Sequence, residues 1–198
     1  MSLLKLFFKT NTQQSENETT IKDFFFYHHG DGMSMDRDDP QKYKQYRTLS
    51  EATIELWRQE LIAQDFELLI SDNADNQWII VGNLIRLISS SKNLVEDHFK
   101  KLLTTIIEIS STLNKRQRIL ILEHFASHAE YTSRGMDCGI YWFARKSSLE
   151  ELLINTIDSL SDFLIDESDN TSKIGWENMQ YRYDKAQVAI RQAIKNFL

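Results

Sequence analysis

The sequence predicts a mainly α-helical protein, built as an antiparallel helical bundle or a short helical-repeat array, with a small β-hairpin near the N-terminus. Two observations predict the helices. Apolar residues recur at helical spacing along most of the chain, and the 198 residues include only six glycines and one proline, whereas a sandwich or barrel needs many tight turns. No fixed repeat period accompanies the pattern, so the bundle and the repeat array both stay open.

The first residues predict a short N-terminal segment and linker. Residues 1–9 are apolar and basic, and the residues that follow, up to residue 20, include no apolar side chain. Lys5 and Lys9 interrupt the apolar stretch, which is too short for a signal peptide, and no apolar run approaches the length of a membrane span. We therefore predict a cytoplasmic protein with a segment at 1–20 and one helical domain at 21–198. The single cysteine agrees, because it permits no intramolecular disulfide.

The β element is predicted at about residues 23–36. Phe24–Tyr27 is an aromatic run of high β propensity. Gly30–Gly32 supplies turn chemistry, and Met33–Met35 resembles a returning strand. A further short strand at 140–143 is a candidate to pair with this hairpin.

Capping residues divide the rest of the chain into helices. Pro40 opens one helix, Ser50 is an N-cap for the next, and Asn114 caps a long apolar helix. Ser147 and Ser148 each precede a glutamate by three residues, which is a duplicated capping-box pattern. After Ser50 we expect a helix that ends between Phe66 and Asn73, and a second helix of about 15 residues that carries Trp78 and Ile88. A strand is the alternative for part of the second, because Ile79–Val81 is β-branched. Further helices are expected at about residues 95–109, 115–131, 149–164 and 179–197.

The final helix carries an apolar seam with steps of three and four residues. The seam comprises Met179, Tyr183, Ala186, Ile190, Ala193 and Phe197. We predict that it packs against a neighbouring helix of the same chain. The alternative is a self-associating structural protein joined through this seam.

Charge and the absence of catalytic motifs predict a protein-binding module rather than an enzyme. The formal net charge is −6 and the pI is about 5.4. An acidic surface repels nucleic acid and attracts a basic protein partner. We predict an immunity- or antitoxin-like protein that needs no cofactor and binds its partner less tightly as salt is added. The predicted partner-binding residues are Asp36, Asp38, Asp39, Tyr43, Tyr46, Asp166 and Asp169.

The alternative function is a metal-dependent hydrolase in a helical bundle. His124 and His128 are four residues apart, so both lie on one helix face and can reach one metal ion. The intervening residues lack the glutamate of the zinc-protease pattern H-E-x-x-H. A third ligand would have to come from His28, His29, His98, Glu130, Asp137 or Cys138. The oligomeric state stays open.

Overall fold

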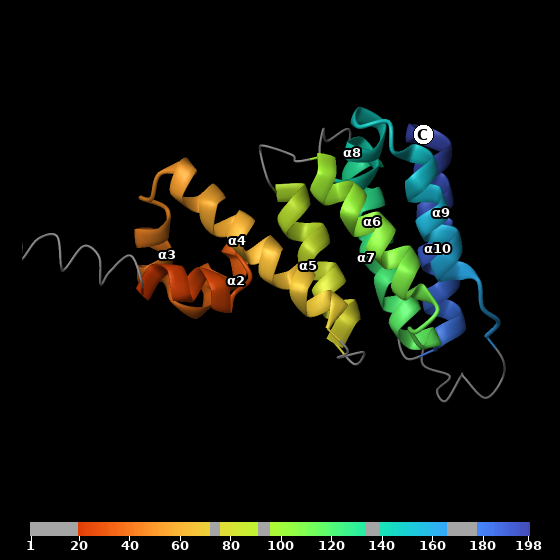
Figure 1. Cartoon of the computed structure of the whole chain (residues 1–198), viewed down its shortest axis with the longest axis horizontal. Helices are drawn as coiled ribbons and strands as arrows, with labels where there is room; N and C mark the ends of the chain where they lie inside the picture. Colours follow the sequence, from red (N-terminus) through yellow and green to blue (C-terminus); the bar gives the residue numbers. More distant parts are fainter. Residues whose placement is uncertain (1–19, 72–75, 91–95, 134–138, 166–177) are drawn as a thin grey trace, which may run out of the picture. The chain divides into compact units, whose positions relative to one another are not determined.

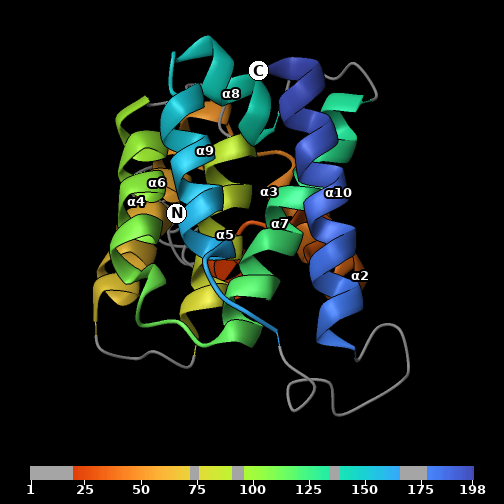
Figure 2. The ribbon, with the colours of Figure 1, turned by 90° about the vertical axis from the view of Figure 1, so that its right-hand side faces the viewer.

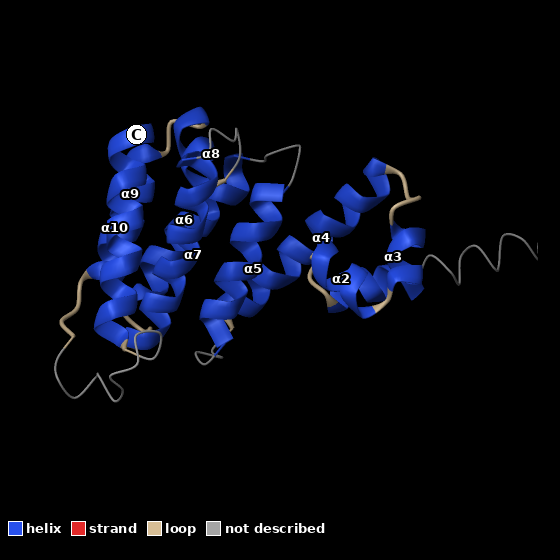
Figure 3. Cartoon of the chain, turned by 180° about the vertical axis from the view of Figure 1, so that it is seen from behind, coloured by secondary structure: helices blue, strands red, loops and turns tan. Residues whose placement is uncertain are grey.

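The computed structural model describes residues 20–71, 76–90, 96–133, 139–165 and 178–198. Every regular element in these ranges is a helix, which confirms the predicted mainly α-helical class (Figure 3). A first helix covers residues 20–27. It is followed (Figure 1) by α2 (Gly32–Asp38), α3 (Pro40–Tyr46), α4 (Glu51–Ile70), α5 (Gln77–Ser90), α6 (Glu96–Ser110), α7 (Lys115–Ser133), α8 (Ile140–Lys146), α9 (Glu150–Ser161) and α10 (Met179–Phe197).

Capping side chains set several of the predicted helix starts. Before α4, the Ser50 hydroxyl accepts a hydrogen bond from the backbone N–H of Thr53 at 3.1 Å. Before α7, Asn114 and Gln117 each accept a hydrogen bond from the other's backbone N–H, at 3.0 and 2.9 Å. This reciprocal pair is a capping box. Before α10, Asn178 makes a one-way cap, in which its Oδ1 accepts a hydrogen bond from the backbone N–H of Tyr181 at 2.9 Å.

The predicted β-hairpin at residues 23–36 is wrong, because its two halves are the first helix and α2. Ile21, Phe24 and Phe25 recur at helical spacing, and all three are buried on one face of the first helix. Burial of this amphipathic face overrides the β propensity of the aromatic run. The strand expected at 140–143 is also wrong, because these residues begin α8.

The capping box predicted at Ser147 and Ser148 does not form. Ser148 has a left-handed backbone with φ 54. The backbone N–H groups of Ser148 and Leu149 donate to the carbonyls of Arg145 and Ala144, at 3.3 and 2.8 Å. This Schellman ending of α8 uses the residues that a capping box would need. The N-cap of α9 is therefore Leu149, which makes no capping side-chain hydrogen bond.

The chain divides into two compact units, and the division falls within α4. Unit 1 ends at Gln64, and unit 2 runs from Asp65 to Leu198. We predicted a single helical domain over residues 21–198, and whether the two units fold as one domain stays a prediction. Each unit is described separately below.

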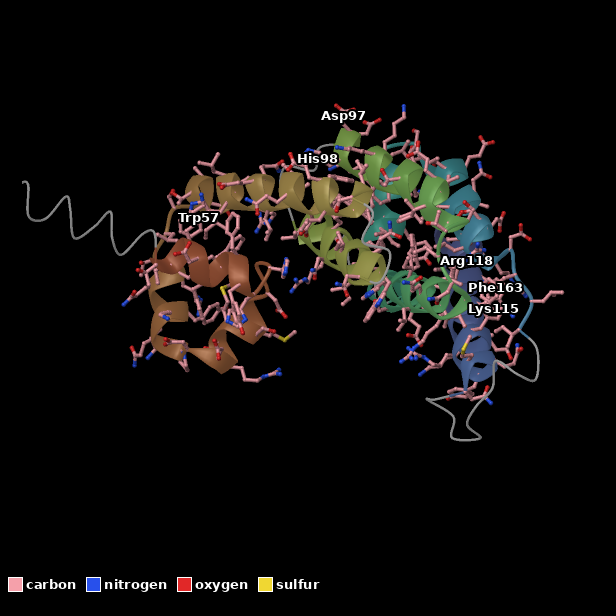
Figure 4. All side chains as sticks on the ribbon, turned by 60° about the horizontal axis from the view of Figure 1, so that its bottom comes forward. Trp57, Asp97, His98, Lys115, Arg118 and Phe163 are labelled. Atoms are coloured by element: carbon pink, nitrogen blue, oxygen red, sulfur yellow. The ribbon has the colours of Figure 1, made fainter. Side chains whose placement is uncertain are left out.

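Unit 1 has an aromatic core. Phe25 on the first helix is fully buried, and its ring centroid lies 5.7 Å from that of Tyr46 and 5.9 Å from that of Trp57. Trp57 lies on α4 (Figure 4). Met35 of α2 and Leu61 of α4 are buried in the same unit. The short helices are therefore held by apolar burial, because pieces of this length are not stable alone.

Unit 2 is organised around α7. This helix packs against α5, α8, α9 and α10, while α6 packs against α5 and α9 (Figure 2). Ile119, Ile121 and Leu122 are buried, as the nearly all-apolar run predicted. In the described part of the chain, no helix combines the length and the apolar composition needed to cross a membrane.

The predicted seam of α10 packs within the chain. Ala186, Ile190 and Ala193 are buried, and α7 is the main neighbour of α10. Arg182 forms a bidentate ion pair with Glu123 of α7, in which Nε donates to Oε1 at 2.6 Å and Nη2 donates to Oε2. These hydrogen bonds raise the pKa of Arg182. These three seam residues are therefore buried within the chain, whereas the side chain of Phe197 lies outside the described residues.

Candidate functional site

The predicted carboxylates of unit 1 have different roles in the structure. Asp39 is the N-cap of α3, and its Oδ1 accepts hydrogen bonds from the backbone N–H groups of Lys42 and Gln41, each at 3.0 Å. These hydrogen bonds, from Lys42 above all, hold the pKa of Asp39 below its ordinary value. Asp36 and Asp38 are exposed on α2. Of the three, Asp39 is needed for the fold, whereas Asp36 and Asp38 face solvent.

Tyr43 and Tyr46 form an aromatic stack that belongs to the core of unit 1. Their ring centroids are 6.0 Å apart, and the Tyr46 ring continues the stack onto Phe25. A Cβ placed on Gly32 would lie 3.2 Å from the Tyr43 hydroxyl, so this ring also touches the start of α2. Burial raises the pKa of Tyr46. Both rings are partly buried and pack within unit 1, and their partner-binding role stays a prediction.

Two exposed apolar side chains flank the turn between the first helix and α2. Tyr27 is 78% exposed and Met33 is 76% exposed, more than any other large apolar residue described in unit 1. The turn is a Schellman motif, in which Gly30 and His29 donate backbone hydrogen bonds to the last turn of the first helix. His29 has the left-handed backbone of this motif, with φ 47. The turn therefore fixes the backbone on both sides.

His28 links one of these side chains to a carboxylate. Its Nε2 lies 3.1 Å from Oδ2 of Asp38, and its ring meets the Tyr27 ring edge-on at a centroid distance of 4.9 Å. The Phe24 ring also meets the His28 ring edge-on, at a centroid distance of 4.7 Å. The histidine side chain is only 10% exposed, whereas that of Asp38 is 59% exposed. The carboxylate is therefore held near Tyr27 and remains open to solvent.

Two further carboxylates share faces with the exposed apolar residues. Asp23 precedes Tyr27 by four residues on the first helix, and Asp36 follows Met33 by three on α2, so each pair lies on one helix face. Neither aspartate forms an ion pair with another described residue. Arg37, which follows Asp36, is exposed, whereas Lys22, which precedes Asp23, forms an ion pair with Glu60. We call the set the turn surface; it comprises Asp23, Tyr27, Met33, Asp36 and Asp38.

The predicted pair of histidines lies on one face of α7, where two glycines leave room for the rings. A Cβ on Gly82 of α5 would lie 2.6 Å from Cε1 of His124, and one on Gly139 would lie 3.2 Å from Nδ1 of His128. Burial lowers the pKa of His124. It also lowers that of His128 to about 4, an effect to which His124 adds. Both imidazoles are therefore neutral at pH 7, as metal ligands and as packed side chains must be.

The described part of the chain places no third metal ligand beside them. Among the described residues, no three His, Cys, Asp or Glu side chains are placed to hold a metal ion. Asp137, Cys138 and the side chain of Glu130 lie outside the described residues. His98 lies on α6 with its ring centroid 6.4 Å from that of Phe66. The metal-dependent hydrolase therefore stays a prediction without a described third ligand.

Other titratable groups of unit 2 are buried between helices. Asp65 of α4 is 1% exposed. Burial raises its pKa to about 6, while the charge of Arg86 on α5 opposes that rise. Tyr141 of α8 is fully buried, its hydroxyl makes no hydrogen bond to a described residue, and burial raises its pKa. These groups affect the stability of unit 2 and present no open surface to a partner.

Known proteins give no further guide. Comparisons with protein-family models, with curated proteins and with solved structures each find no match. The functional argument therefore depends on the residues of this chain. Asp166 and Asp169 lie outside the described residues, so their partner-binding role stays a prediction.

The exposed half of the turn surface gives little signal in the sequence alone. The predicted strand groups Tyr27 with Phe24 and Phe25, which are buried, and no motif marks Asp23. A helix predicted over residues 20–27 would distinguish the exposed from the buried residues, because Asp23 and Tyr27 share one helix face, whereas Phe24 and Phe25 lie toward another. Met33 gave no comparable signal, because alternation with Met35 fits a strand as well as a short helix.

Proposed function

We propose that this protein is a helical protein-binding module whose turn surface captures a basic protein partner, in an immunity- or antitoxin-like role. The observation that carries the proposal is the pairing of two exposed apolar side chains, Tyr27 and Met33, with three solvent-facing carboxylates around one fixed turn. The partner segment would offer lysine or arginine beside an apolar residue.

Each part of the turn surface supports a different aspect of binding. Tyrosine is enriched among the residues that dominate interface energies, and methionine adapts its shape to varied apolar partners. The Schellman turn fixes the backbone between Tyr27 and Met33, so little conformational entropy is lost there on binding. The carboxylates would attract a basic partner and make its association depend on salt.

Selection from a random peptide library displayed on phage, with the full-length protein immobilised, tests this proposal. We expect the selected peptides to be enriched in lysine or arginine next to leucine, isoleucine or phenylalanine. Synthetic peptides from the selection should bind less tightly as salt increases, because screening weakens attraction between exposed charges. Selected peptides without a basic bias, or with salt-insensitive binding, would contradict the electrostatic basis of the proposal.

Variants locate the binding surface. The double variant Tyr27→Ala, Met33→Ala should weaken binding about 30-fold, as expected for the loss of about 2 kcal/mol from anchor residues. Leu56→Ala is a matched control, because Leu56 lies on α4 in unit 1, is 66% exposed and lies outside the turn surface. Circular dichroism checks that each variant is folded. An equal loss of peptide affinity in the double variant and in Leu56→Ala would show that the peptides do not bind at the turn surface.

A further inference from the structure

The outer face of α9 is acidic. Glu151, Asp158 and Asp162 are exposed at helical spacing along one side, and α9 (Glu150–Ser161) includes no lysine or arginine. The opposite side of the helix is buried against the core through residues such as Leu153 and Leu160. The acidic side therefore has no packing partner among the described residues.

The outer face of α10 is basic and partly apolar. Lys185, Arg191 and Lys195 are exposed on the side away from α7. Tyr181 and Val188 lie among them, 52% and 66% exposed. Asp184 is the one carboxylate on this side of α10, and it accepts a hydrogen bond from Gln180 at 2.9 Å. The face therefore carries a net positive charge.

Figure 2 shows α9 and α10 on the same side of unit 2, and the described side-chain contacts between these segments lie at and just after the end of α9. Gln187 of α10 donates a hydrogen bond to the Ser161 hydroxyl at 2.6 Å, and the Phe163 and Tyr183 ring centroids are 5.3 Å apart. The later residue of the first segment contacts the earlier residue of α10, so α9 and α10 run antiparallel.

These contacts fix which residues of α9 and α10 lie at the same height along the helix axes. Because both helices rise by the same distance per residue, equal numbers of residues counted backwards along α9 and forwards along α10 lead to positions at the same height. Within about one helical turn, the level pairs of opposite charge are Glu151 with Lys195 and Asp158 with Arg191, whereas Asp162 lies level with both Lys185 and Asp184. None of the four side chains in the two pairs forms an ion pair with another described residue. The charges are therefore complementary in position and are not paired within one chain.

We propose that this face of unit 2 binds a second copy of the chain, with α9 of each copy lying against α10 of the other. A two-fold axis parallel to the helices keeps every residue at its own height. It therefore brings Glu151 and Asp158 of one copy opposite Lys195 and Arg191 of the other. Such an interface is self-complementary, as a symmetric dimer requires.

Apolar contact adds to the charge pairing. Tyr181 and Val188 would be covered at the interface, and Leu164, which follows α9, is 86% exposed on the single chain. The face spans about 28 Å along α10 and the width of two helices, which gives roughly 500 Å² per copy. This is at the lower limit for specific interfaces, so we expect a weak dimer that salt dissociates further. The buried seam of α10 takes no part.

The mass of the full-length protein in solution tests the dimer. Light scattering and sedimentation velocity should show a monomer–dimer equilibrium at about 0.05 M salt that shifts to monomer at about 0.5 M. The acidic-face variant Glu151→Lys, Asp158→Lys should weaken dimerisation at least about tenfold. The basic-face variant Arg191→Glu, Lys195→Glu should do the same, because each replaced charge occurs twice in the dimer.

Mixing the two variants gives the decisive result. In a mixed dimer both contacts pair opposite charges again, so an equimolar mixture should form a heterodimer although neither variant forms a homodimer. The variant carrying all four substitutions should form a homodimer again. A protein that stays monomeric at about 0.5 mM in low salt, or a mixture without a heterodimer, would overturn the proposal. Circular dichroism confirms folding, and peptide binding at the turn surface is measured independently.

Discussion

Replacement of Asp65 by asparagine should stabilise the protein at neutral pH. Asp65 is buried in unit 2, and burial raises the pKa of its carboxyl to about 6, against the opposing charge of Arg86. At pH 7 and above, the folded chain must therefore keep a poorly solvated carboxylate. The asparagine side chain has nearly the same shape and does not become charged.

The magnitude follows from the shift of this pKa. The ordinary value is 3.8 and the folded value is about 6, so the ionised group costs about 3 kcal/mol of unfolding free energy at pH 7 and above. Because the folded pKa is the higher one, stability from this group is fully present below pH 3.8 and is lost as pH rises to about 6. Asp65→Asn should thus gain up to about 3 kcal/mol at pH 8 and almost nothing at pH 3.5.

Urea unfolding followed by circular dichroism at several pH values gives these free energies. Glu67→Gln is the matched control, because Glu67 lies on the same helix and is exposed. It should change the stability by less than about 0.5 kcal/mol at every pH. A loss of stability in Asp65→Asn at pH 8 would refute the reasoning, since it would mean that attraction to Arg86 outweighs the cost of burying the charge.

Three further predictions concern the polar and backbone features of the two units. Burial lowers the pKa of His128 from 6.5 to about 4, so the unfolding free energy of the wild type should fall by up to about 3 kcal/mol as pH decreases from 6.5 to about 4. His128→Gln should remove most of this pH dependence, which urea titrations at several pH values measure. Gly82→Ala should destabilise unit 2 by about 1–2 kcal/mol, because the new methyl group overlaps His124; in a His124→Ala background the same change should become neutral or stabilising. His29→Gly should raise stability by about 0.5–1 kcal/mol in thermal unfolding, since glycine relieves the left-handed backbone of the Schellman turn.

Helix positions could be predicted where local chemistry decides them. Ser50 and Asn114 cap helices as predicted, and the apolar run on α7 lies at the centre of unit 2. These features depend on residues close in sequence, so one sequence suffices to read them. The aromatic run at Phe24–Tyr27 failed because propensity and period disagreed, and burial of the helical face decided the outcome.

The candidate site could be predicted only in part, because exposure depends on the tertiary structure. The sequence singled out Asp36 and Asp38, which are exposed, and equally Asp39, which the fold uses as a cap. It selected Tyr43 and Tyr46 as anchors, yet both contribute to the stack in unit 1. An acidic or aromatic residue looks the same in a sequence whether it caps a helix, fills a core or faces a partner.

The pairing of α10 with α7 also constrains when the chain can complete its fold during synthesis. All contacts of unit 1 are available once Gln64 has been made, whereas α7 must wait for α10, the last helix of unit 2. Until then the apolar side of α7 that receives Ile190 and Ala193 stays open. A nascent or truncated chain that ends before α10 would therefore expose an apolar helix face, which makes it a natural substrate for chaperones and proteases.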